Sequence, residues 1–237
     1  MKFETCGNKS NKAVILIHTL YTSAKFFEPI KEILAEKYFV IMPTLSAHYE
    51  NSKFISTQDE INQLQTFLKD NKIYSIYAVA GFSLGGNIAY EFFCQNSMII
   101  EKAVIDSAPL FNFPKFIENI FYKKYSRCLK KIKMPNCDIA KELNKCFNGM
   151  GEYQKEIAPK LAFENLKPLV SSCFKTKIHK LSKNEINKLV FIYGRKDEAN
   201  LCNFRLRKYK IVKMKGYGHC GFYRKNPTKW AETFILQ

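Results

Sequence analysis

The segment VAGFSLGGNIAYEFF, residues 79–93, places one serine, Ser83, between two glycines that lie two positions before and two positions after it. The residues before Ser83 form an apolar run typical of a buried strand, and those after it are rich in small residues with helical spacing. A tight strand-to-helix turn exposes its central side chain and crowds the neighbouring positions, so Gly81 and Gly85 remove side chains that would collide. The segment therefore predicts that the Ser83 hydroxyl projects from such a turn.

The same rhythm of strand and helix extends along the chain. Six short runs rich in β-branched and aromatic residues predict strands at 13–20, 38–45, 74–83, 102–110, 188–194 and 209–216. Their centres are nearly continuously apolar rather than alternating, which is typical of parallel strands covered on both faces. Helical patterns separate them, including one in which Ser56 or Thr57 followed by Glu60 predicts a capping box. The sequence thus predicts an α/β fold with a doubly wound, mainly parallel sheet of about six strands.

One interval is too long for an ordinary crossover. Residues 111–187 show helical spacing and no strand pattern, so they predict an inserted helical lid or cap. The expected core is then formed by residues 1–110 and 188–237.

Composition limits the classes of function. With 237 residues and 46% hydrophobic residues, the chain is expected to form one soluble globular unit, and no segment has the length of a signal sequence or membrane span, so a cytoplasmic location is expected. The formal net charge of +17 comes mostly from lysines spread along the chain, which favours compositional bias over a nucleic-acid site. No nucleic-acid partner is expected. Membrane contact through the basic lid helix, around Lys123 to Lys131, is a weaker alternative.

The residues around Ser83 resemble the nucleophile turn of the α/β-hydrolase family, and the resemblance extends over nearly the whole chain apart from the helical insertion. It implies that Ser83 is the nucleophile. Near the first strand, the stretch IHTLYTS resembles the family's His-Gly-x loop with Thr19 in place of glycine, which implies an oxyanion hole formed by the backbone amides of Leu20 and Leu84. We interpret His18 and His48, near the same face, as loop-stabilising residues.

The order of the family's catalytic residues can be followed further along the chain. It implies that Asp197, in FIYGRKDEAN, is the acid that orients the base and that His219, in KGYGHCGFY, is the base. Asp106, at the end of the preceding predicted strand, is the alternative acid. Neither a cofactor nor a metal is expected, because the spacing around Cys202, His219 and Cys220 matches no zinc pattern.

This constellation predicts a serine hydrolase that cleaves a carboxylic ester through an acyl-enzyme, with a small-molecule ester as its partner. Aromatic residues of the insertion are expected to line a hydrophobic acyl pocket: Phe111, Phe113, Phe116, Phe121 and Tyr122. A thioesterase or small-peptide hydrolase on the same triad is an alternative, as is a ligand-binding homologue that has lost turnover. The sequence leaves the oligomeric state open.

Overall fold

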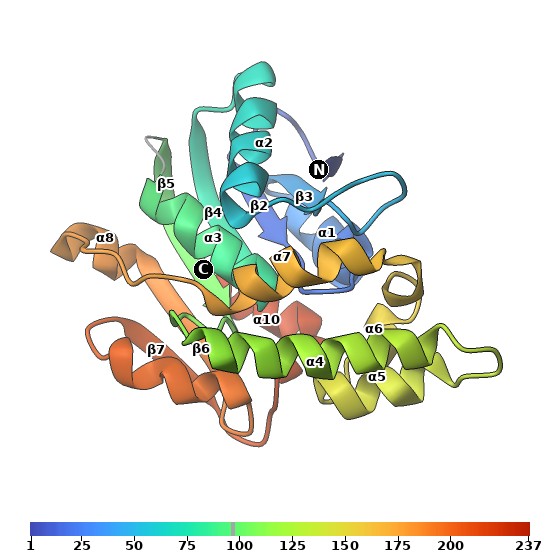
Figure 1. Cartoon of the computed structure of the whole chain (residues 1–237). Coiled ribbons are helices and arrows are strands. Elements are labelled where there is room, and N and C mark those ends of the chain that lie inside the picture. The colour runs from blue at the N-terminus through green and yellow to red at the C-terminus, as the bar shows by residue number, and fades with distance from the viewer. Residues whose placement is uncertain (96–97) are drawn as a thin grey trace.

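The fold is built on a seven-stranded sheet (Figure 1). The computed structural model describes residues 1–95 and 98–237. The strands are β1 (Lys2–Cys6), β2 (Ala13–Ile17), β3 (Phe39–Thr44), β4 (Ser75–Phe82), β5 (Ile99–Asp106), β6 (Leu189–Gly194) and β7 (Lys210–Met214). Their order across the sheet is β1-β3-β2-β4-β5-β6-β7, and all neighbours are parallel except the pair β1 and β3. The predicted doubly wound, mainly parallel α/β fold is confirmed.

The strand missing from the prediction is β1, at the edge of the sheet. It pairs antiparallel with β3, with Lys2 opposite Thr44, and most of its residues are exposed. An edge strand with charged, solvent-facing side chains lacks the continuous apolar run that marks the buried strands. Its one aromatic residue, Phe3, stacks on Phe67 of helix α2 (Thr57–Asp70) with ring centroids 3.9 Å apart.

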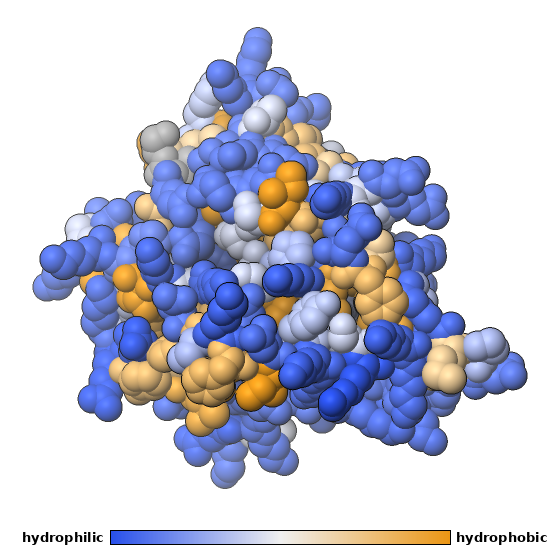
Figure 2. Space-filling view, viewed as in Figure 1, coloured by the Kyte–Doolittle hydropathy of each residue, from blue (hydrophilic) through white to orange (hydrophobic). Residues whose placement is uncertain are grey.

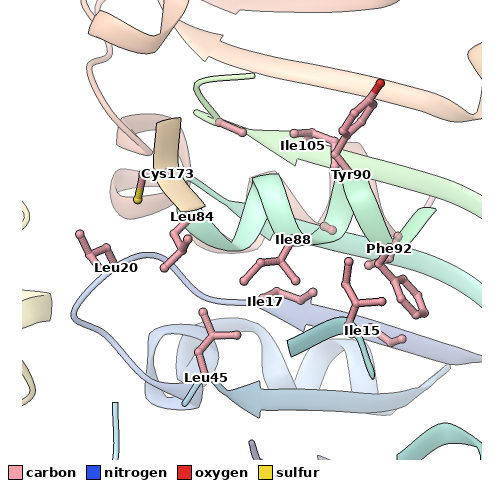
Figure 3. Close-up of a cluster of buried hydrophobic side chains, with 14 of the residues drawn as sticks. Ile15, Ile17, Leu20, Leu45, Leu84, Ile88, Tyr90, Phe92, Ile105 and Cys173 are labelled. Carbon is pink, nitrogen blue, oxygen red and sulfur yellow. The ribbon is translucent and has the colours of Figure 1, made fainter. Parts of the chain in front are cut away.

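Helices cover both faces of the sheet, and each face has its own apolar cluster. Helices α2, α3 (Leu84–Gln95) and α7 (Phe163–Phe174) lie on one face, and α1 (Glu28–Ala35), α9 (Gly221–Lys225) and α10 (Pro227–Phe234) lie on the other. Alternate residues of β2 contribute to the two clusters, as the pleat of a strand requires. Figure 3 shows Ile15 and Ile17 of β2 in one cluster with Ile88 of α3.

The chain between β5 and β6 is helical. It forms α4 (Lys115–Ile132), α5 (Ile139–Phe147), α6 (Gly151–Gln154), the short 3-10 helix η2 (Ala158–Lys160), α7 and α8 (Lys183–Lys188). Within residues 111–187, all of them described, no strand forms, although an isolated bridge joins Asn112 to Lys175. Figure 1 shows α4 lying beside α5. The division of the chain into core and lid stays a prediction.

The start of α2 differs from the expected capping box. The Ser56 hydroxyl caps the helix by accepting a hydrogen bond from the Asp59 amide at 3.1 Å. Glu60 is buried instead, and its carboxylate accepts a hydrogen bond from the Ser46 amide at 3.1 Å. None of the described helices combines the length and the apolar character needed to cross a membrane.

Candidate active site

Ser83 occupies a strained turn between β4 and α3. Its φ of +52° lies in the left-handed region, which L-residues other than glycine seldom adopt. A Cβ atom added to Gly81 would lie 2.1 Å from the Gly85 carbonyl oxygen, and one added to Gly85 would lie 2.3 Å from the carbonyl oxygens of Ile17 and His18. Both glycines are therefore needed for the sharp turn that presents the serine side chain.

His219 and Asp197 form a hydrogen-bonded pair. Asp197 is the N-cap residue of the 3-10 helix η3 (Glu198–Arg205) after β6, and His219 lies in the loop between β7 and α9. The Asp197 Oδ1 atom lies 3.0 Å from His219 Nδ1 and accepts a second hydrogen bond from the Ala199 amide at 3.0 Å. This geometry leaves His219 Nε2 as the ring nitrogen that can accept a proton from a nucleophile.

The pair shifts the pKa values of both groups. Burial lowers the pKa of His219, but the neighbouring Cys220 and Asp197 side chains outweigh burial and raise it well above its ordinary value. Burial raises the pKa of Asp197, but the positive imidazole and the hydrogen bonds to its carboxylate lower it by more. The arrangement therefore favours a carboxylate that stabilises a protonated histidine.

Ser83, Asp197 and His219 line one cavity of about 300 Å³. Thr19 and Leu20 line it as well, and most of its remaining wall is apolar: Pro109, Phe113, Phe121, Tyr125, Phe147, Met150, Cys173, Phe174, Ala199 and Leu201. A cavity of this volume and composition is typical of small-molecule sites.

The predicted acyl pocket is corrected at three positions. Phe113 and Phe121 line the cavity, whereas Phe111, Phe116 and Tyr122 lie outside its lining. The Phe116 side chain is 63% exposed, because it lies on the solvent side of α4. The ring of Phe111 packs against Phe113, Phe204 and Arg205.

Sequence reasoning missed the lining residues Tyr125, Phe147, Met150 and Phe174. Phe121 and Tyr125 are four residues apart on α4 and so share a helix face, which is a signal available in the sequence. The packing of α5, α6 and α7 around the cavity, which brings in the other residues, has no local signal.

Of the two backbone amides expected to form an oxyanion hole, that of Leu84 directly follows Ser83 in the chain, and that of Leu20 belongs to a residue that lines the same cavity as Ser83. Leu84 is the first residue of α3, so its amide has no acceptor within that helix and lies at the positive end of the helix dipole. Leu20 is buried at the cavity wall, and its carbonyl oxygen accepts a hydrogen bond from Gln154 Nε2 at 3.0 Å. Figure 3 shows Leu20 and Leu84 at the same end of the apolar cluster.

Two buried histidines hold the loop that contains Leu20. His18 Nε2 accepts a hydrogen bond from the Leu45 amide at 2.9 Å, and His48 Nε2 accepts one from the Tyr21 amide at 3.0 Å. The other ring nitrogen of each faces a carbonyl oxygen, which fixes one neutral tautomer for each ring. Burial lowers the pKa of His18 well below its ordinary value and that of His48 to about 4.

The alternative acid, Asp106, has different partners. One carboxylate oxygen accepts the Ser107 hydroxyl at 2.8 Å, and the other accepts Trp230 Nε1 at 2.9 Å. Ser107 Oγ in turn accepts a hydrogen bond from the Cys220 amide at 2.8 Å. Burial raises the pKa of Asp106 to about 7. The geometry therefore pairs Asp197, not Asp106, with the histidine.

No group of three or more His, Cys, Asp or Glu side chains in residues 1–95 and 98–237 is arranged to hold a metal ion.

No protein-family model and no curated protein matches this sequence. Solved structures do match. One is an alpha/beta hydrolase enzyme from a Medee basin deep-sea metagenome library, with a TM-score of 0.77 and 15% identity over 100% of this chain and 94% of that one. The chain has the α/β-hydrolase fold.

Two further structures share the α/β-hydrolase fold with this chain. A marine microorganism esterase has a TM-score of 0.72 and 18% identity, covering 98% of this chain and 97% of its own. A thioesterase domain from the curacin biosynthetic pathway has a TM-score of 0.67 and 14% identity, covering 99% of this chain and 94% of its own. Ser83, Asp197 and His219 occur in this order along the chain, and all three line the same cavity.

Proposed function

We propose that this protein is a serine hydrolase that cleaves carboxylic esters through an acyl-enzyme. The observation that carries the proposal is one cavity lined both by a serine in a left-handed turn, Ser83, and by a hydrogen-bonded histidine and aspartate, His219 and Asp197. The similarity to structures described as esterases supports the same class of reaction.

The reaction begins when Ser83 Oγ attacks the ester carbonyl carbon and His219 Nε2 takes the hydroxyl proton. The amides of Leu20 and Leu84 stabilise the oxyanion of the tetrahedral intermediate. His219 then gives its proton to the leaving alcohol, and the carbon–oxygen bond to that alcohol breaks. A water molecule, deprotonated by His219, then attacks the carbonyl carbon of the acyl-serine. The bond from this carbon to Ser83 Oγ breaks, Ser83 Oγ takes the proton back from His219, and the carboxylic acid is released.

The role of Asp197 follows from its hydrogen bond to His219 Nδ1. It holds the imidazole in the tautomer that leaves Nε2 free to accept a proton, and it stabilises the imidazolium formed during each half of the reaction.

The apolar wall formed by Phe113, Phe121, Phe147 and Phe174 favours a hydrophobic acyl chain of small or medium length.

The test is mass spectrometry of the intact protein after incubation with a fluorophosphonate, which reacts with activated serines. We expect one adduct on the wild-type protein and none on Ser83→Ala. A matched control, Ser75→Ala, removes an exposed hydroxyl at the start of the same strand and should leave labelling unchanged. If the folded wild-type protein stays unlabelled, or if Ser83→Ala is labelled equally, the proposed mechanism is wrong.

A further inference from the structure

A second recess lies beside the candidate active site, between α4 and α5. It has a volume of about 450 Å³ and nine lining residues: Ile120, Lys123, Lys124, Arg127, Cys128, Lys131, Glu142, Lys145 and Cys146. We refer to it as the basic groove. In the view of Figure 2, hydrophilic and hydrophobic side chains are interspersed on the surface over α4.

The charge of the basic groove exceeds what the composition of the chain explains. Five of its nine lining residues are Lys or Arg, compared with 38 of 237 in the chain, and its only acidic lining residue is Glu142. The lysines and the arginine from α4 recur at three- and four-residue spacing, so they lie on one face of that helix. The groove is therefore a concentrated positive site rather than a sample of a basic surface.

Glu142 neutralises part of this positive charge by forming ion pairs with two of the lysines. Its two carboxylate oxygens lie 2.8 Å from Lys131 Nζ and 2.5 Å from Lys145 Nζ. Within the described chain, no carboxylate pairs with Lys123, Lys124 or Arg127. A concave site with a formal excess of four positive charges favours a multiply charged anion such as a phosphate or pyrophosphate.

The basic groove also adjoins the catalytic cavity. Lys124 and Cys146 line both recesses, so the two sites lie side by side. The catalytic cavity is mainly apolar and suits an acyl chain, whereas the groove suits the charged part of the same molecule. A membrane surface fits this arrangement less well. A flat layer of headgroups cannot enter a recess between two helices, so it would not contact all of the charged side chains there.

From this juxtaposition we infer that the substrate is an acyl ester or thioester whose leaving group bears phosphates, which bind in the basic groove. The inference rests on the proposed function. For a thioester, Ser83 Oγ attacks the carbonyl carbon, the carbon–sulfur bond breaks, and the thiol leaves with the proton held by His219. Water then cleaves the acyl-serine as it does for an ester, so the reaction needs no further reactant.

The kinetic test compares two thioesters that carry the same acyl group and have similar thiol leaving groups, butyryl-coenzyme A and butyryl-N-acetylcysteamine. The second lacks the phosphates of coenzyme A together with its adenosine and pantoate, so the salt dependence isolates the contribution of the charges. We expect kcat/KM to be about 10- to 100-fold higher for the coenzyme A thioester at low salt, and this advantage to shrink as KCl screens the charges. The double variant Lys123→Gln/Arg127→Gln should lose most of this advantage, measured in each protein as the ratio of kcat/KM for the two thioesters.

A matched control removes two exposed lysines that lie outside the groove. Lys37→Gln/Lys229→Gln lowers the net charge by the same amount and should keep the full advantage. A kcat/KM ratio near one for the wild-type protein, or an equal loss in both double variants, would overturn the proposal. In either case fluorophosphonate labelling of Ser83 would still show whether the protein is a serine hydrolase.

A binding test is independent of turnover. The Cys128 thiol lines the groove, and its contact with Cys146 lowers its pKa, so alkylation by iodoacetamide reports on occupancy. Coenzyme A should slow alkylation of Cys128 at least severalfold in the wild-type protein and in Lys37→Gln/Lys229→Gln, and should leave it unchanged in Lys123→Gln/Arg127→Gln. If coenzyme A gives no protection but vesicles containing phosphatidylserine do, the groove contacts a lipid surface and the proposal is wrong.

Discussion

At the scale of single residues, the charge of Asp197 should set the pH at which the protein becomes active. A protonated His219 cannot accept the serine proton, so kcat/KM should fall as the pH drops through the pKa of this histidine. Asp197 contributes to raising that pKa above its ordinary value of 6.5. We therefore expect the acid limb of the profile for a p-nitrophenyl ester to lie above pH 6.5.

Asp197→Asn removes the charge while preserving the shape of the side chain. The acid limb of the kcat/KM profile should move to lower pH, and kcat should fall by about 10⁴-fold, because the amide favours the wrong imidazole tautomer.

Asp106→Asn tests the alternative acid. It weakens buried hydrogen bonds to Ser107 and Trp230, so it should lower the melting temperature but leave the limb in place. A shift of the limb in Asp106→Asn but not in Asp197→Asn would reverse the assignment.

At the scale of elements, α3 can pack closely against the end of β2 because residue 85 is a glycine and has no side chain. A Cβ atom at residue 85 would lie 2.3 Å from two carbonyl oxygens of the β2 end, and backbone atoms cannot rotate away. Gly85→Ala should therefore push α3 from the sheet and lower the free energy of unfolding by about 1–3 kcal/mol. Gly218→Ala is the control, because a Cβ atom added to Gly218 would lie 4.0 Å from its nearest neighbour, the Lys196 carbonyl oxygen. Urea unfolding of both variants would show whether the close approach matters.

The elements also show what sequence can and cannot predict. The five inner strands, β2 to β6, were predictable because both of their faces are covered, so their apolar runs are continuous. The edge strand β7, whose residues are exposed or half-buried, was predictable from its β-branched residues Ile211 and Val212. The edge strand β1 was not predictable, because most of its residues are exposed and they form no apolar run. Ser83, Asp197 and His219 follow strands and could be placed by their position in the chain. Phe116 could not, because apolar residues recur around α4 and only its packing decides which face is buried.

At the scale of the whole molecule, buried titratable groups make the stability depend on pH in opposing directions. His18 and His48 stay neutral in the folded protein, so unfolding at acid pH takes up protons and the stability they contribute is lost as the pH falls below 6.5. The pKa of Asp106 is raised to about 7, so above pH 4 unfolding releases its proton. The stability that Asp106 contributes therefore falls as the pH rises from about 4 to about 7, opposite to the effect of the two histidines. The net slope is a sum over these groups, so a single-site variant is needed to isolate one of them.

His48→Gln provides that isolation, because the glutamine oxygen can accept the Tyr21 amide hydrogen bond but takes up no proton. The folded pKa of about 4 for His48 and an unfolded value near 6.5 predict that the wild-type protein loses about 2–3 kcal/mol more than the variant between pH 7.5 and pH 4.5. Urea unfolding at several pH values measures this difference, whatever constant cost the substitution adds at every pH. Parallel pH profiles for the two proteins would mean that His48 is not held neutral, and the loop carrying Leu20 would then need another anchor.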